Sequence, residues 1–131
     1  MSVALDIATH LQSNGYGPIG NGLSINKLMD TPNNQVVVYQ SPVGMPAAKA
    51  MGTTIILQYP SFQIVVRNTS SQTAESTCEA IHKLLDGAKG LTLNGITYYS
   101  VEATDTPFKL TEDDNKRYLY AFNGRAVKDQ S

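Results

Sequence analysis

Few side chains in this sequence have the type and spacing that could support chemistry. Cys78 and His82 are four residues apart, so on a helix they face the same way. A thiol beside an imidazole is the start of a nucleophile–base pair, which also requires an orienting acid within hydrogen-bond reach. Cysteine is more often a buried apolar residue, so we expect a core cysteine beside a boundary histidine.

Ligand-binding motifs are equally sparse. A metal site needs three or four ligands, and neither CxxC nor HxxxH occurs. The carboxylates 112–114 lack the alternating ligands and central glycine of a calcium loop, so a solvated loop is expected. The glycines within 15–22 follow a helix and precede a strand, whereas a phosphate loop needs the reverse order. We therefore expect no catalytic residue, no metal and no cofactor.

Charge argues against a dedicated nucleic-acid binder. The chain carries ten basic and eleven acidic residues, for a net charge of −1, and its densest basic pair is Lys116-Arg117. Lys and Arg that displace counterions supply most of non-specific nucleic-acid affinity. Tyrosines at 98, 99, 118 and 120 lack the basic neighbours of a base-stacking sheet. We expect cross-strand core pairs, with a subunit interface as the second interpretation.

The length indicates one domain, residues 1–131. The composition indicates that part of its surface is covered by other proteins. Only 16% of residues are charged, against about 25% in typical soluble domains. The lone cysteine excludes an internal disulfide and fits a reducing compartment. With neither a leader-like start nor a long apolar run, we expect no membrane association and assembly in the cytoplasm.

The segments that position these residues follow from periodicity. Helical spacing predicts a first helix from Val3 to about Leu11. A second helix carries one continuous apolar stripe, formed by Ala74, Cys78, Ile81, Leu85 and Ala88. Asn94-Gly95 predicts a hairpin with a type I′ turn between 91–93 and 96–103.

The remaining strands are expected at 23–29, 35–40, 53–59, 62–67 and 116–127, with a break at Pro60-Ser61. Residues 41–52 are expected as a long irregular loop, 104–115 as a polar connection and 128–131 as a frayed tail. This order predicts an α+β fold, in which a single layer of mostly antiparallel sheet has two helices packed on one face.

The loop predicted at 41–52 is the candidate docking surface. It places Met45, Pro46 and Met51 on a backbone rich in proline and glycine, and methionine adapts easily to irregular partner surfaces. An ordinary surface loop is the equally weighted alternative. Arg67, at the end of the strand predicted at 62–67, completes the set of candidate interface residues.

Several short motifs resemble one family when they are taken in order. A Gly-Pro-Ile-Gly passage at 17–20 follows the first helix, and 30–39 resembles the opening strand of the family. Residues 62–67 are similar to its strand leading into a helix, and 93–98 to its later hairpin. In this order the chain resembles tail terminator, or tail-completion, proteins of tailed bacteriophages, which are related to minor capsid proteins.

The resemblance implies a structural virion protein, not an enzyme, at the head-proximal end of the tail. Such proteins form a homo-oligomeric ring, commonly a hexamer, that caps the tail tube and offers a docking surface to the head connector. Genome DNA passes through the lumen without specific binding. The family has no catalytic residues to carry over. Two alternatives stay open: a head-completion or stopper protein of the connector, and a monomeric cytosolic protein-binding module.

Overall fold

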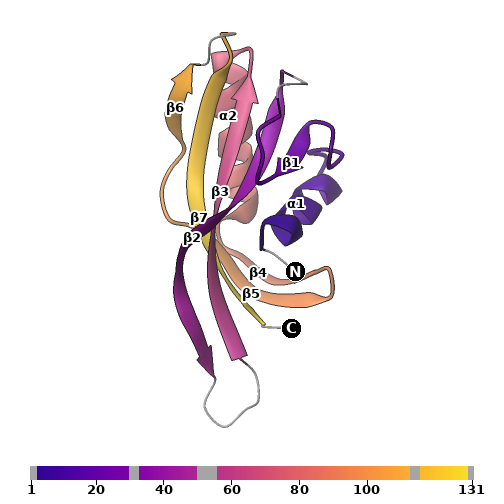
Figure 1. Cartoon of the computed structure of the whole chain (residues 1–131), viewed down its shortest axis with the longest axis vertical. Coiled ribbons are helices and arrows are strands. Elements are labelled where there is room, and N and C mark those ends of the chain that lie inside the picture. Colours follow the sequence, from indigo (N-terminus) through magenta and orange to yellow (C-terminus); the bar gives the residue numbers. More distant parts are fainter. Residues whose placement is uncertain (1–2, 30–32, 50–55, 113–115, 130–131) are drawn as a thin grey trace.

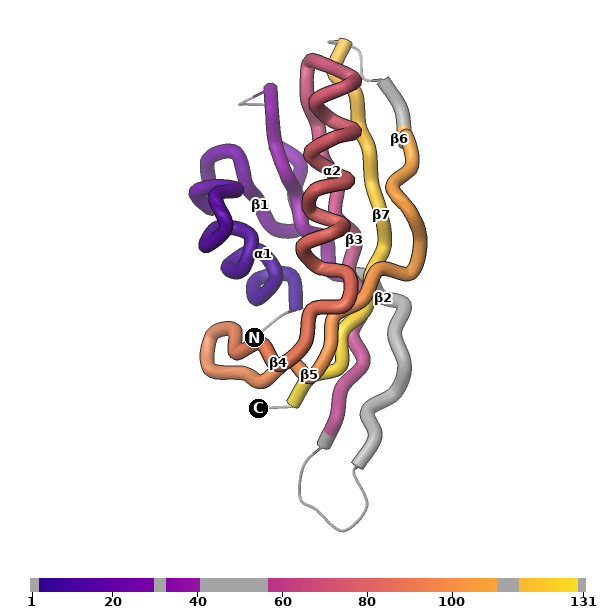
Figure 2. The backbone as a smooth tube through the Cα atoms, turned by 180° about the vertical axis from the view of Figure 1, so that it is seen from behind, coloured from indigo at the N-terminus to yellow at the C-terminus, as the bar shows by residue number. Residues whose placement is uncertain are grey.

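A computed structural model describes residues 3–29, 33–49, 56–112 and 116–129, with side chains for all of these except 41–49, 56, 111 and 112. It contains a seven-stranded sheet with two helices, and Figures 1 and 2 show it from opposite sides. The elements are α1 (Val3–Ser13), β1 (Leu23–Ile25), β2 (Gln35–Lys49), β3 (Ile56–Asn68), α2 (Ser71–Leu85), β4 (Ala88–Leu93), β5 (Ile96–Ala103), β6 (Phe108–Glu112) and β7 (Tyr118–Asp129).

The sheet is antiparallel except at one edge. Its order is β1-β2-β3-β7-β5-β4, with β6 also paired to β7, and only β1 and β2 run parallel. Strands β5 and β6 lie end to end along the same side of β7, because Ala103 pairs with Gly124 and Phe108 with Ala121. They form one long strand that residues 104–107 interrupt.

Both helices pack on one face of this sheet, which confirms the predicted α+β class. Phe62, Ile64 and Val66 alternate along β3 and point into the main core. The same core holds the buried stripes of both helices, including Ile7 from α1 and Ile81 from α2. Alternation in a strand directs every second side chain to the same face, so the pattern at 62–67 assigned the two faces correctly.

The prediction of a loop at 41–52 is wrong for most of that segment. Strand β2 continues to Lys49 and pairs with β3, with Lys49 opposite Ile56. Two register shifts, between Ser41 and Met45 and between Met45 and Ala48, admit extra residues into β2. Bulges and edge positions tolerate proline, which has no N–H to donate, so the prolines of this stretch do not end the strand. Residues 50–52 lie outside the described part.

The break predicted at Pro60-Ser61 is also wrong. Strand β3 passes through Pro60 and keeps one register with β7 on both sides, from Gln58 opposite Lys128 to Ser61 opposite Arg125. On its other side, Pro60 lies opposite the first register shift of β2, where regular pairing is already interrupted. The missing N–H therefore costs no regular ladder bond.

Four smaller expectations need correction. Strand β6 forms within the predicted polar connection, and β7 extends through Asp129 into the predicted tail. Helix α2 ends at Leu85 because Asp86 and Gly87, with φ of 82°, leave the helical conformation; Ala88 therefore begins β4. The strand predicted at 23–29 ends at Ile25. Three of these four concern strands, whose presence and extent depend on a partner strand more than on local sequence.

The predicted hairpin is confirmed, and its turn anchors α1. Asn94 and Gly95 have φ of 52° and 79°, as a type I′ turn requires. Asp6, fully buried in α1, accepts hydrogen bonds from the Tyr98 hydroxyl and from Asn94 Nδ2, the latter at 2.8 Å. Figure 1 shows the tip of this hairpin beside the N-terminal end of α1. A buried carboxylate needs such donors, so the hairpin and helix depend on each other.

Gly124 is closely enclosed within the sheet. It pairs with Phe62 on one side and Ala103 on the other. A Cβ at Gly124 would lie 2.5 Å from Phe62 Cζ and 2.9 Å from the Glu102 carbonyl oxygen. Because the Phe62 ring is fully buried and the second atom is backbone, neither can move away cheaply. Only glycine fits here.

We expect Gly124→Ala to destabilise the protein by about 1–3 kcal/mol, the usual cost of forcing a methyl group into a packed core. Urea unfolding followed by circular dichroism measures this free energy. Phe62→Leu serves as the partner variant: the double variant should lose less stability than the sum of the two single ones, because the smaller side chain removes the clash. Unchanged stability in Gly124→Ala would contradict the packing described here.

Candidate functional site

Cys78 is buried in the core, and His82 is half-buried beside it on α2. Burial raises the pKa of the Cys78 thiol to about 12, and the charges of Glu79 and Asp105 add to this shift. The His82 ring packs edge-on against Phe122 at 5.1 Å, and its Nε2 lies 3.1 Å from the Asp105 carbonyl oxygen. This is the predicted core cysteine beside a boundary histidine.

The carboxylates at 112–114, expected in a solvated loop, lie outside the described side chains. No group of three or more His, Cys, Asp or Glu side chains that could hold a metal occurs among the residues with described positions. The carboxylate cluster at 112–114 lies outside that set, since residues 113 and 114 are not described and Glu112 is described only in its backbone. The features that remain for function are surfaces.

The face of the sheet opposite the helices is covered by a thin apolar layer. Val37, Val65 and Ala121 lie in line across β2, β3 and β7, and all three are buried. Leu28 and Tyr39 pack on this strip. Leu28 belongs to the segment that follows β1, so this segment crosses the face. We call this side of the sheet the helix-free face.

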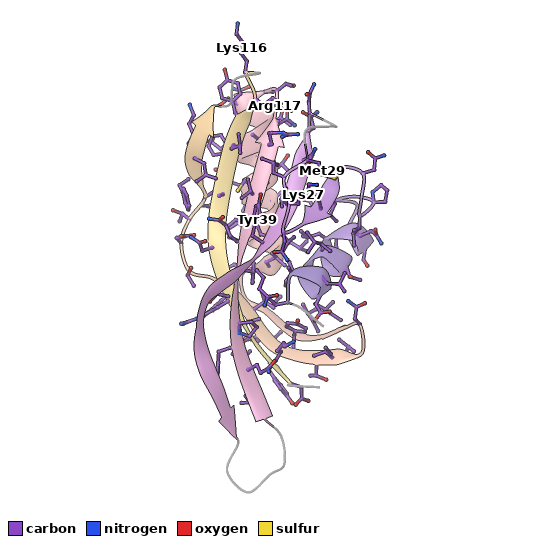
Figure 3. All side chains as sticks on the ribbon, in the orientation of Figure 1. Lys27, Met29, Tyr39, Lys116 and Arg117 are labelled. Carbon is purple, nitrogen blue, oxygen red and sulfur yellow. The ribbon has the colours of Figure 1, made fainter. Side chains whose placement is uncertain are left out.

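Figure 3 looks onto the helix-free face, with Lys27, Met29 and Tyr39 near one another. Burial raises the pKa of the Tyr39 hydroxyl, while a hydrogen bond with the Leu28 backbone and the charge of Arg67 lower it. The two groups that lower this pKa are both tied to the segment after β1: Leu28 belongs to it, and Arg67 donates a hydrogen bond to its Met29 carbonyl. Tyr39 therefore marks the point where that segment, β2 and β3 meet.

Buried polar side chains hold the described parts of the connection between β1 and β2, residues 26–29 and 33–34, which we call the Met29 loop. Arg67, only 2% exposed, donates from Nη2 to the Met29 carbonyl at 2.7 Å and from Nε to the Asn33 carbonyl at 2.9 Å. Gln35, the cross-strand partner of Arg67, donates to the same Met29 carbonyl at 2.7 Å. The Gln35 amide oxygen also accepts the Met29 N–H at 3.1 Å. Arg117 donates to the Asn33 side chain at 3.4 Å.

This network fixes the backbone at Met29 and at Asn33 and leaves the Met29 side chain outside. Met29 is 37% exposed, and it is one of four large apolar side chains exposed in the described chain: Met29, Tyr99, Phe108 and Leu110. Lys27 and Lys116 are exposed on the side shown in Figure 3. An apolar anchor on a pre-ordered backbone suits protein recognition, because little conformational entropy remains to be lost on binding.

The predicted interface residues differ in where they lie and in how much of them the structure describes. Arg67 lies beneath the helix-free face, where it holds the Met29 loop. Met45 and Pro46 belong to β2, with backbone described and side chains not, and Met51 lies outside the described residues. Sequence reasoning missed Met29 and Gln35. One sequence feature could have indicated Gln35. It is a polar residue at the start of a valine-rich strand, directly after a turn that contains a proline.

Comparison with known proteins points to one class. Residues 10–130 match the family described as bacteriophage tail terminator protein. A solved structure titled virion of native gene transfer agent particle has the same fold, with a TM-score of 0.61 and 18% identity over 96% of this chain and 95% of that one. A second solved chain has a TM-score of 0.48 and 15% identity over 82% and 79%.

No curated protein matches the sequence. Among the described helices, none is long and apolar enough to cross a membrane.

We expect Arg67→Lys to destabilise the protein by about 1–3 kcal/mol, because an ammonium group cannot reproduce the planar fork that reaches two carbonyls. Arg125→Lys is the matched control: Arg125 bonds Glu102 at 2.6 Å but is half exposed, so its loss should stay below about 1 kcal/mol. Urea denaturation compares the two variants. Equal effects would show that Arg67 does not hold the Met29 loop.

Proposed function

The chain belongs to the bacteriophage tail terminator family, and from this premise we propose that it caps the tail tube as a homo-oligomeric ring and provides the docking surface for the head connector. Family membership makes it a bacteriophage structural protein of the virion tail. The ring, its sixfold number and the two partners, tube protein and connector, are the proposed steps. We infer a structural role and no catalysis.

The Met29 loop is the observation that supports a contact function most directly. Buried Arg67 and Gln35 contribute hydrogen bonds to one exposed loop, although a buried cation is costly to desolvate. A loop with no partner gains nothing from such an arrangement beyond stability. For a protein that assembles, a fixed loop lowers the ordering cost of binding.

Charge and topology agree with a ring around DNA. A net charge of −1 provides little counterion-driven attraction to the phosphate backbone, so DNA can pass through a lumen without being held. In a closed ring each subunit presents one patch to a different patch of its neighbour. The two lateral margins of this sheet differ, since β1 and α1 lie at one and β6 at the other, as Figure 1 shows.

We retain the segment 41–52 as a second docking candidate, with Met45, Pro46 and Met51 as its proposed contact residues. The outer half of β2 extends beyond the three residues that pair with β1, so this stretch of strand is an edge within the described chain. A segment with methionines suits a partner surface that is not rigidly complementary, and of the two only Met45 lies in the described strand.

Native mass spectrometry of the purified chain, over a concentration series and with tail tubes assembled without it, tests the ring. We expect a discrete closed oligomer, a hexamer, either in solution or on tube ends, because terminators act at the end of a polymer. A monomer at every concentration that also fails to bind tube ends would overturn the proposal and favour the monomeric binding module. A ring that binds connectors but no tubes would favour the stopper role.

We expect Met29→Ser to weaken attachment to tubes or connectors at least tenfold, about 1.4 kcal/mol, with the free energy of unfolding nearly unchanged. Sedimentation of the labelled chain with each partner measures this affinity. Tyr99→Ser is the control, since Tyr99 is exposed to a similar extent, 41% against 37%, on β5. Wild-type affinity of Met29→Ser for both partners would remove the Met29 loop from the docking surface.

A further inference from the structure

Strand β6 forms an open margin of the sheet. It pairs with β7 on one side, and no described strand pairs with its other side. Figures 1 and 2 show it at the opposite lateral margin from β1 and α1. A strand edge carries a row of N–H and C=O groups, which another extended chain satisfies best.

The turn that leads into β6 is clamped to the rest of the fold. The Asp105 carboxylate accepts the Asn123 N–H at 2.7 Å and the Asn123 side-chain amide at 2.9 Å. Thr104 N–H donates to the Asn123 carbonyl at 2.9 Å, and His82 of α2 contacts the Asp105 carbonyl. The edge is therefore positioned before any partner arrives, which lowers the entropic cost of strand addition.

The described side chains of β6, at 108–110, leave this edge accessible. Phe108 is 36% exposed and Leu110 is 43% exposed, so this five-residue strand holds two of the four large exposed apolar side chains in the described chain. Proteins commonly protect edges with an outward lysine. The only lysine of β6, Lys109, instead holds its ammonium 5.4 Å from the ring centroid of Tyr118 on β7.

We propose that the outer edge of β6, with Phe108 and Leu110, binds an edge strand of a second copy of this chain. The proposal rests on the proposed ring. Topology identifies the kind of contact: along the strand order, β6 lies on one side of the β3–β7 pair, whereas β1 and β2 lie on the other. A β6-to-β6 contact would be isologous and would stop at a dimer, so ring closure requires β6 to meet a different edge of its neighbour.

The chemistry of the partner follows from the edge. It must offer unpaired backbone N–H and C=O groups at the spacing of a strand, and apolar side chains that cover Phe108 and Leu110. The short length of β6 and the register shift between Lys109 and Thr111 limit pairing to a few residues. The contact is thereby restricted to one defined neighbour, and it cannot propagate as a long cross-strand ladder.

The test compares wild-type chain, Phe108→Ser/Leu110→Ser and the control Tyr99→Ser by native mass spectrometry, alone and on tail tubes. We expect the double variant to keep the wild-type unfolding midpoint and to require at least tenfold more protein to form the oligomer. The control should assemble like wild type. Hydrogen exchange of wild type should also show the amides of Phe108–Thr111 becoming protected on assembly.

The outcomes separate this inference from the proposed function. Rings from the double variant at wild-type concentration, or β6 amides that stay unprotected in the ring, would overturn the β6 contact and leave the ring intact. A wild-type oligomer that stops at a dimer would overturn both. No wild-type oligomer, even on tube ends, would overturn the ring and with it the second-copy contact. Protection of β6 on tubes without oligomer formation would assign the edge to a tube protein instead.

Discussion

The approach of three strands at Gly124 is the constraint on which the rest of the sheet depends. The Phe62 ring of β3 lies where a side chain at Gly124 of β7 would be, and the Glu102 carbonyl closes the site from β5. Phe62 also contributes to the core beneath the helices. The pair of Ala103 with Gly124 is the last of the β5–β7 ladder, so β5 leaves β7 here. The interruption that separates β5 from β6, and hence the margin formed by β6, begins at this point.

The two faces of the sheet are stabilised by different means. The helix side is a deep apolar core, in which the buried carboxylate of Asp6 is balanced by donors from the β4–β5 hairpin. The helix-free face has one row of small apolar residues and, beside it, the buried cation of Arg67. A buried charge contributes little net stability compared with apolar packing, but removing its partners is costly. The arrangement therefore fixes one geometry of the Met29 loop while it adds little to the net free energy of unfolding.

Local signals were sufficient for part of this fold. The Asn94-Gly95 turn, the apolar stripe of α2 as far as Leu85 and the alternation at 62–67 each depend on neighbours in sequence, and each was predicted correctly. The outer half of β2 and the whole of β6 form because a partner strand is present, and no local pattern contains that information. Prolines at 42, 46 and 60 were interpreted as interruptions, but they lie at bulges or on an edge, where the missing donor has no consequence. The role of Arg67 was equally inaccessible, because it depends on the register that places Arg67 opposite Gln35.

The family match over 10–130 agrees with the order of short motifs, although none of those motifs identifies a contact. We infer candidate contact residues from two observations: the side chain is exposed, and the backbone beneath it is held by hydrogen bonds. On the described chain, Met29 is exposed above buried hydrogen bonds, and Phe108 and Leu110 are exposed beside a clamped turn. An exposed apolar side chain on a mobile loop would lose more conformational entropy on binding and invite nonspecific association. In the assembly that we propose, placing these few apolar groups on fixed backbone, at separate parts of the molecule, would let a chain with few charges meet different neighbours through different surfaces.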